Sequence, residues 1–115
     1  MDSKILLVDD AAFMRMLIKN TLNILEAEDG EIACKVYEEE KPDLTIMDIT
    51  MPNKGGIEAL KDIKAINPDA KIIMCSAMGQ ESMVVEAIKH GALDFIVKPF
   101  KPDRIIQTVT KILGD

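Results

Sequence analysis

The sequence is poor in aromatic residues, in cysteine and in clustered positive charge. It contains no Trp, one Tyr, three Phe and two Cys. Cys34 and Cys75 have a spacing typical of neither a metal knuckle nor a disulfide framework, so we expect both to be buried free thiols. Acidic residues outnumber basic ones by 20 to 14, for a formal net charge of −6. This balance, without a Lys/Arg stripe, argues against nucleic acid and anionic membranes and favours proteins or cations as partners.

Long hydrophobic runs are also missing. The longest stretch without a charged residue covers positions 72–80, whereas a membrane span needs about 20 apolar residues. The N-terminus has no basic segment leading into an apolar one, so no secretory signal is expected and the cytoplasm is the expected location. The 115 residues predict a single domain, 1–115, whose core needs no disulfide or metal.

Short apolar runs alternate with segments of helical periodicity. The runs cover residues 5–8, 44–47, 72–75 and 95–97, with a weaker one at 23–27. Runs that are apolar at every position are typical of parallel strands covered on both faces. Helical stripes cover residues 14–22, 32–37, 57–63, 83–88 and 102–113. The alternation predicts an α/β fold with three layers, a doubly wound five-stranded parallel sheet with helices on both faces.

Polar side chains follow most of these strands. Asp9 and Asp10 come after the first run, Asp48 after the third strand, Ser76 after the fourth and Lys98 after the fifth. Ligands of open parallel sheets bind at this carboxyl edge. Each residue alone is also typical of a turn or a helix cap. Three carboxylates at one edge repel each other, however, unless a cation neutralises them.

This set of residues suits a hard divalent cation and a phosphoryl group. Mg²⁺ prefers oxygen ligands and shares its coordination sphere with phosphate oxygens. Phosphoryl transfer requires mainly positioning and positive charge, which a metal ion and Lys98 would supply. The first loop, Asp9-Asp10-Ala11-Ala12, has neither the G-x-G-x-x-G of a dinucleotide site nor the small, hydroxyl-rich loop of a flavin mononucleotide site. We therefore interpret it as a metal loop.

Four segments, VDDAAFMR, MDITMP, CSAMG and IVKPF, resemble the receiver domain of two-component response regulators. The resemblance covers residues 4–113 and is closest to free-standing chemotaxis regulators. It implies a flavodoxin-like (CheY-like) sheet of order 2-1-3-4-5. It also implies a phosphorylation-activated signalling switch that catalyses only its own phosphorylation and dephosphorylation, and is otherwise no enzyme.

The resemblance also implies a metal site and a phosphoacceptor. Asp48 would accept a phosphoryl group from a phosphohistidine of a histidine kinase (CheA-like). Asp10 and Asp48 would ligate Mg²⁺, for which Mn²⁺ can substitute, together with the backbone carbonyl of Thr50, and Asp9 would act through water. Thr50 would in addition influence the lifetime of the acyl phosphate. A phosphatase is a further expected partner.

The remaining implied roles concern switching. Ser76 and Lys98 would contact the phosphoryl group, the Lys98–Pro99 bond would be cis, and Phe95 would turn inward. Two charge-assisted hydrogen bonds could supply about 3 to 6 kcal/mol, and inverting a two-state population needs about 5.5 kcal/mol. The face formed by 80–90, 94–97 and 102–113 would then bind an output protein such as a motor switch protein (FliM-like).

Three alternatives compete with this interpretation. A haloacid dehalogenase-like phosphatase also uses an Asp nucleophile and Mg²⁺, but it needs a second Asp where Thr50 stands. A receiver of a non-chemotaxis pathway remains open. A receiver that never accepts phosphate is disfavoured by the intact set of Asp10, Asp48, Ser76 and Lys98.

His90, beside Gly91, is expected to interact with a helix dipole and not to accept phosphate.

The connection after the first helix departs from the family pattern. Leu22 runs directly into Asn23, whereas such a connection normally takes about 2 to 6 residues. Residues omitted from the chain, a left-handed Asn23, and exchange of elements between protomers each explain the short junction. We favour omission and expect a monomer.

Overall fold

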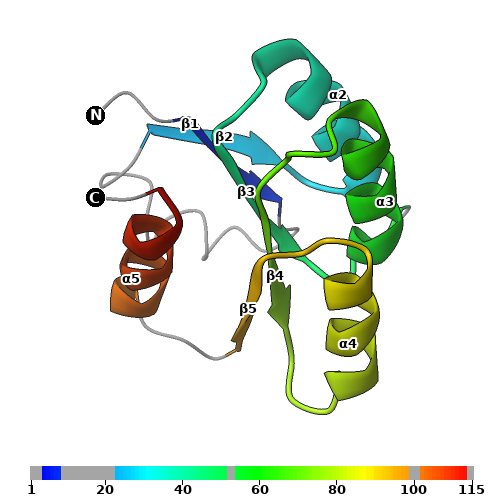
Figure 1. Cartoon of the computed structure of the whole chain (residues 1–115), viewed down its shortest axis with the longest axis vertical. Helices are drawn as coiled ribbons and strands as arrows, with labels where there is room; N and C mark the ends of the chain where they lie inside the picture. The colour runs from blue at the N-terminus through cyan, green and yellow to red at the C-terminus, as the bar shows by residue number, and fades with distance from the viewer. Residues whose placement is uncertain (1–3, 9–22, 52–53, 99–101, 114–115) are drawn as a thin grey trace.

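The computed structural model describes residues 4–8, 23–51, 54–98 and 102–113 (Figure 1). Its elements are β1 (Lys4–Val8), β2 (Asn23–Ala27), α2 (Gly30–Glu40), β3 (Leu44–Asp48), α3 (Gly56–Ile66), β4 (Ile72–Ser76), α4 (Glu81–Lys89), β5 (Asp94–Val97) and α5 (Pro102–Leu113). The helix expected at 14–22 and the junction at Leu22 lie outside the described residues.

The five strands form one parallel sheet in the order β2-β1-β3-β4-β5. This confirms the predicted flavodoxin-like fold and its strand order. In Figure 1, α2, α3 and α4 lie on one side of the sheet and α5 lies on the other. Because β3 is the central strand, its last residue, Asp48, lies at the middle of the carboxyl edge.

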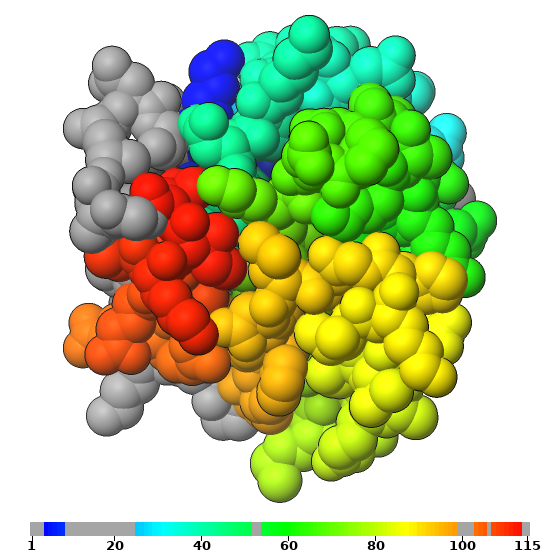
Figure 2. All heavy atoms as spheres, viewed as in Figure 1, coloured from blue at the N-terminus to red at the C-terminus, as the bar shows by residue number. Residues whose placement is uncertain are grey.

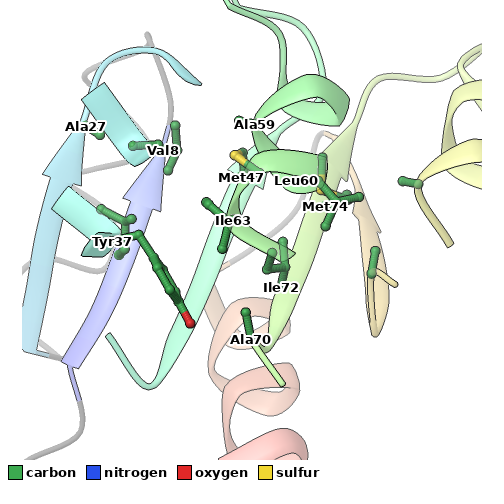
Figure 3. Packing of buried hydrophobic residues seen from close by; sticks show 14 of the residues in the cluster. Val8, Ala27, Tyr37, Met47, Ala59, Leu60, Ile63, Ala70, Ile72 and Met74 are labelled. Atoms are coloured by element: carbon green, nitrogen blue, oxygen red, sulfur yellow. The ribbon is translucent and has the colours of Figure 1, made fainter. Parts of the chain in front are cut away.

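Alternate side chains of the strands enter two cores, one on each face of the sheet. The larger core joins the sheet to α2, α3 and α4 (Figure 3), and its members include Leu6, Val8, Tyr37, Met47, Leu60, Ile63, Ile72 and Met74. The smaller core joins the sheet to α5 and includes Ile5, Leu7, Leu44, Ile46, Ile73, Cys75, Ile96, Ile105 and Val109. Every residue of β3 and β4 is buried, which confirms that these apolar runs are covered on both faces.

Two expectations from the apolar pattern are wrong. Strand β5 is an edge strand, so Phe95 and Val97 remain 39% and 41% exposed and only Ile96 is buried. Helix α4 buries only Ala87 of its predicted stripe, while Met83 and Ile88 are exposed. Among the described residues β5 is the last strand on this side of the sheet, so it has a strand neighbour, β4, on one side only.

The helix ends follow the sequence, whereas the prediction of two buried thiols is correct for Cys75 only. Both cysteines are free; Cys75 is buried and Cys34 is half-buried, and burial raises the pKa of the Cys34 thiol. Asp29 caps α2, because its Oδ1 accepts a hydrogen bond of 2.9 Å from the Ile32 amide. His90 is the C-cap of α4, in agreement with its predicted position at a helix end. None of the helices within the described ranges is long and apolar enough for a membrane span.

Candidate functional site

Asp48 ends the central strand and is only 7% exposed. Two backbone hydrogen bonds fix the chain just beyond it. The Ile49 amide donates to the Cys75 carbonyl at 2.9 Å, and the Gly56 amide donates to the Ile49 carbonyl at 2.8 Å. The first bond extends the pairing of β3 with β4, and the second closes the connection from β3 to α3. The backbone around Asp48 is therefore held on two sides.

Gly56 allows α3 to begin directly against this backbone. A Cβ atom on Gly56 would lie 2.1 Å from the Asp48 carbonyl oxygen and 2.9 Å from the Ile49 Cα. Movement of either backbone atom would disturb the end of β3 or its connection to α3. The absence of a side chain at position 56 therefore helps to position Asp48.

Lys98 meets Asp48 at this edge, as the sequence predicts for residues that follow neighbouring strands. Lys98 Nζ lies 2.6 Å from Asp48 Oδ2. The Lys98 amide donates to the Ser76 carbonyl at 2.7 Å, which aligns the end of β5 with the end of β4. The two side chains are 24% and 10% exposed, so the ammonium offsets the cost of burying the carboxylate.

Ser76 and Thr50 also lie at the carboxyl edge. Ser76 is 2% exposed and ends β4, and Asp48 pairs with its neighbour Cys75 in the sheet register. The Thr50 amide lies 3.3 Å from Asp48 Oδ1. Three of the predicted site residues thus end or directly follow the adjacent strands β3, β4 and β5.

Gln80, predicted only as the first residue of the output-binding segment 80–90, also contacts the site. Its Oε1 accepts a hydrogen bond of 2.6 Å from the Ala77 amide, and its Nε2 donates to Thr50 Oγ1 at 2.8 Å. One carboxamide therefore joins the connection after β3 to the connection after β4. The capping preference of residues that precede a helix does not explain this role, because the Gln80 side chain makes no capping hydrogen bond to α4.

Other predicted site residues lie outside the described part of the chain. These are Asp9, Asp10 and Pro99. Within the described ranges, no group of three His, Cys, Asp or Glu side chains could hold a metal ion. Asp48 nevertheless offers the carboxylate oxygens that Mg²⁺ prefers, and its chemistry fits that ion.

The connection from β3 to α3 carries a second cation that is already paired. Lys54 Nζ forms an ion pair with Asp62 of α3, and this hydrogen bond raises the pKa of Lys54. The Lys54 carbonyl accepts a hydrogen bond of 3.1 Å from the Gly30 amide at the start of α2. Lys54 thus fastens this connection to two helices, whereas Lys98 is the lysine that contacts Asp48.

A mainly apolar groove begins at the end of β4 and runs between α4 and β5. Its volume is about 640 Å³, and it is lined by Ser76, Ala77, Met78, Glu81, Val84, Val85, Ile88, Lys89, Phe95 and Val97. Figure 2 shows α4 in yellow, β5 in orange and α5 in red on one face of the molecule. The groove therefore links Ser76 to the exposed ring of Phe95.

Comparisons with known proteins agree with this architecture. The sequence model of the response regulator receiver domain family matches residues 5–110 of this chain. The chemotaxis protein CheY of Bacillus subtilis is 56% identical over 120 residues, covering 99% of this chain and 100% of the relative. The alignment is longer than this chain of 115 residues, so some positions of the relative have no counterpart here. CheY of Thermotoga maritima is 52% identical, covering 97% of this chain and 98% of the relative.

A solved structure gives the same result. The response regulator domain of Thermotoga maritima CheB superimposes with a TM-score of 0.85 at 33% identity, covering 100% of this chain and 98% of that chain. These matches support the receiver interpretation over the haloacid dehalogenase-like phosphatase. The chain belongs to the response regulator receiver family, whose members are phosphorylation-activated switches of two-component signalling and not conventional enzymes.

Proposed function

We propose that Asp48 is the phosphoacceptor of this switch, and the observation that supports this role is its contact with Lys98. A carboxylate oxygen of Asp48 would attack the phosphorus of a kinase phosphohistidine. The new O–P bond forms as the N–P bond breaks, and the bonding electron pair returns to the histidine nitrogen. The product is an acyl phosphate on Asp48. The Lys98 ammonium, 2.6 Å from Asp48, is placed to balance the charge that the phosphoryl group brings.

The proposal includes a Mg²⁺ site, for which Mn²⁺ can substitute. Asp48 and Asp10 would bind the ion directly, the Thr50 carbonyl would complete the protein ligands, and Asp9 would act through water. The bound ion would supply positive charge at the phosphoryl oxygens. Lys98 contacts Asp48 directly. A hydrogen bond between two protein side chains therefore also holds this carboxylate in position.

The signal would leave the site through Ser76 and Phe95. A phosphoryl group would draw the Ser76 hydroxyl and the Lys98 ammonium toward itself. Ser76 and Phe95 line the same groove, and movement of Ser76 would make room for the Phe95 ring to turn inward. The face of α4, β5 and α5 would then bind an output protein.

The proposed pathway is chemotaxis. Its basis is the name of the relatives, which are chemotaxis proteins at 56% and 52% identity. The partners would be a CheA-like histidine kinase, a FliM-like motor switch protein and a phosphatase, all acting on a monomer in the cytoplasm. Thr50, whose amide lies 3.3 Å from Asp48, would influence the lifetime of the acyl phosphate.

Intact mass measurement after incubation with a small phosphodonor and Mg²⁺ tests the proposal. The parent chain should gain the mass of one phosphoryl group, and Asp48→Asn should gain none. Asp69→Asn, which alters an exposed carboxylate, is the matched control and should behave like the parent. Equal modification of the parent and Asp48→Asn would refute the role of Asp48. Rapid turnover of many phosphoesters would instead favour a phosphatase.

A further inference from the structure

Gln80 uses both ends of its carboxamide within the site. Oε1 accepts from the Ala77 amide at 2.6 Å, and Nε2 donates to Thr50 Oγ1 at 2.8 Å. The partners lie in different connections of the sheet, and Gln80 and Thr50 are separated by 30 positions. Gly79, with a φ of 90°, adopts the left-handed conformation that turns the chain between Ala77 and Gln80. The Gln80 side chain thus forms a hydrogen bond within the connection that follows β4, back to the Ala77 amide.

The backbone of Gln80 links this closure to α4. Gln80 is the N-cap of α4, and its carbonyl accepts from the Met83 and Val84 amides, both at 3.0 Å. Val84 and Phe95 both line the apolar groove. A change at the Gln80 carboxamide therefore acts on the first turn of the helix that forms one wall of the groove.

The Ala77 amide is a donor for which a phosphoryl group would compete. It directly follows Ser76, whose hydroxyl is proposed to contact the phosphoryl group. A phosphoryl group has three strong acceptor oxygens and carries nearly two negative charges. Hydrogen bonds to charged acceptors are roughly twice as strong as neutral ones. The phosphoryl group would thus be a better acceptor for the Ala77 amide than the neutral Gln80 carboxamide.

We infer that the Gln80 carboxamide is a positioning latch, which holds the Ala77 amide in the unphosphorylated protein and is displaced when Asp48 carries a phosphoryl group. This inference rests on the proposed function of Asp48. The displacement frees the connection after β4 and the first turn of α4. The Gln80 carboxamide thus competes with the phosphoryl group for the Ala77 amide. Once displaced, it transmits the change to the groove through the first turn of α4. Removing the carboxamide therefore favours phosphoryl binding but uncouples it from α4.

The binding of fluoroberyllate, a stable analogue of the phosphoryl group, tests this inference on the full chain with Mg²⁺. Gln80→Ala removes the competing acceptor, so its dissociation constant should fall by about 2- to 10-fold, the worth of one neutral hydrogen bond. Gln80→Glu keeps an acceptor for the Ala77 amide and adds a negative charge, so its dissociation constant should rise. Gln107→Ala alters an exposed glutamine of α5 and should leave the constant unchanged.

Amide resonances provide a second readout that does not depend on the analogue. Gln80→Ala alone should shift the Ala77 amide in a ¹H–¹⁵N spectrum and increase its hydrogen exchange. In the parent, fluoroberyllate should shift the Ala77 amide together with the Gln80 side-chain NH₂ and the Met83 and Val84 amides. In Gln80→Ala, the response of the Met83 and Val84 amides should shrink.

The outcomes separate the inference from the proposed function. A parent chain that binds no fluoroberyllate overturns both. If the parent binds it and Gln80→Ala binds it equally well or more weakly, the latch is refuted while the role of Asp48 stands. An Ala77 amide that is unchanged in Gln80→Ala also refutes the latch. Thermal unfolding of both Gln80 variants shows whether the proteins compared are folded.

Discussion

Lys98 Nζ lies 2.6 Å from Asp48 Oδ2, although 50 positions separate the two residues in the chain. The contact arises because β3 and β5 both flank β4 and run in the same direction. The residues at their carboxyl ends therefore converge. The Asp48–Lys98 ion pair of the site therefore depends on the strand order of the sheet.

Replacement of Lys98 by Met should impair both stability and phosphorylation. Removing one partner of a fully buried ion pair costs about 3 to 5 kcal/mol. Lys98 is partly exposed, so we expect a smaller loss of about 1 to 3 kcal/mol in the free energy of unfolding. Urea denaturation measures this loss. Phosphorylation by a small phosphodonor should slow by about 10-fold or more, since one charge-assisted hydrogen bond is lost.

Lys61→Met is the control for Lys98→Met. Lys61 is exposed on α3, so the change in net charge is the same while the site is untouched. It should retain the stability and the phosphorylation rate of the parent. Equal behaviour of the two variants would show that the Asp48–Lys98 contact contributes nothing.

Phe95→Trp gives a fluorescence reporter for the proposed switch, because the chain contains no Trp. The native ring is 39% exposed and lines the groove, so the new indole should be quenched readily by acrylamide. Fluoroberyllate with Mg²⁺ should reduce quenching and shift the emission to shorter wavelength, because the ring turns inward. The double variant with Asp48→Asn should show no response. Unchanged quenching in a protein that binds the analogue would contradict the role of Phe95.

Gly55 and Gly56 provide a matched pair that tests the approach of α3 to Asp48. A Cβ on Gly56 would meet backbone at 2.1 Å, whereas the nearest atom to a Cβ on Gly55 is the Ile49 carbonyl oxygen at 3.6 Å. Gly56→Ala should therefore lower the free energy of unfolding by about 1 to 3 kcal/mol or more, a typical cost of overpacking. Gly55→Ala should have a small effect. Similar urea midpoints for the two variants would show that the close approach is unimportant.

Much of the fold could be predicted because burial on both faces leaves a plain signature in sequence. Strands β3 and β4 are buried at every residue, and both coincide with continuous apolar runs. The run at β5 has the same composition but lies at an edge. Its exposure depends on strand order, which apolar content does not encode. That order came from the resemblance to a family, and the sheet confirms it.

The site was predictable only where it depends on strand ends. Asp48, Ser76 and Lys98 each end or follow a strand, so parallel pairing alone brings them to one edge. Gln80 escaped prediction because its role depends on a turn at Gly79, with a φ of 90°, and on a contact with Thr50 in another connection. Neither the turn nor the contact has a periodic signature. Loop side chains of this kind are found only from the three-dimensional structure.

Thr45 and Thr108 offer a last test, which concerns buried hydroxyl groups. Thr45 is fully buried in β3, and its Oγ1 has no hydrogen-bond partner among the residues that the structure describes. Thr108 Oγ1 donates to the Arg104 carbonyl at 2.9 Å and accepts from Arg104 Nη1. Thr45→Val removes an unpaired polar atom without changing the side-chain shape, so it should raise the free energy of unfolding by about 1 kcal/mol or more. Thr108→Val breaks a satisfied hydrogen bond and should lower it by about 1 kcal/mol. Urea denaturation of both variants measures the difference, and a destabilised Thr45→Val would show that its hydroxyl has a partner after all.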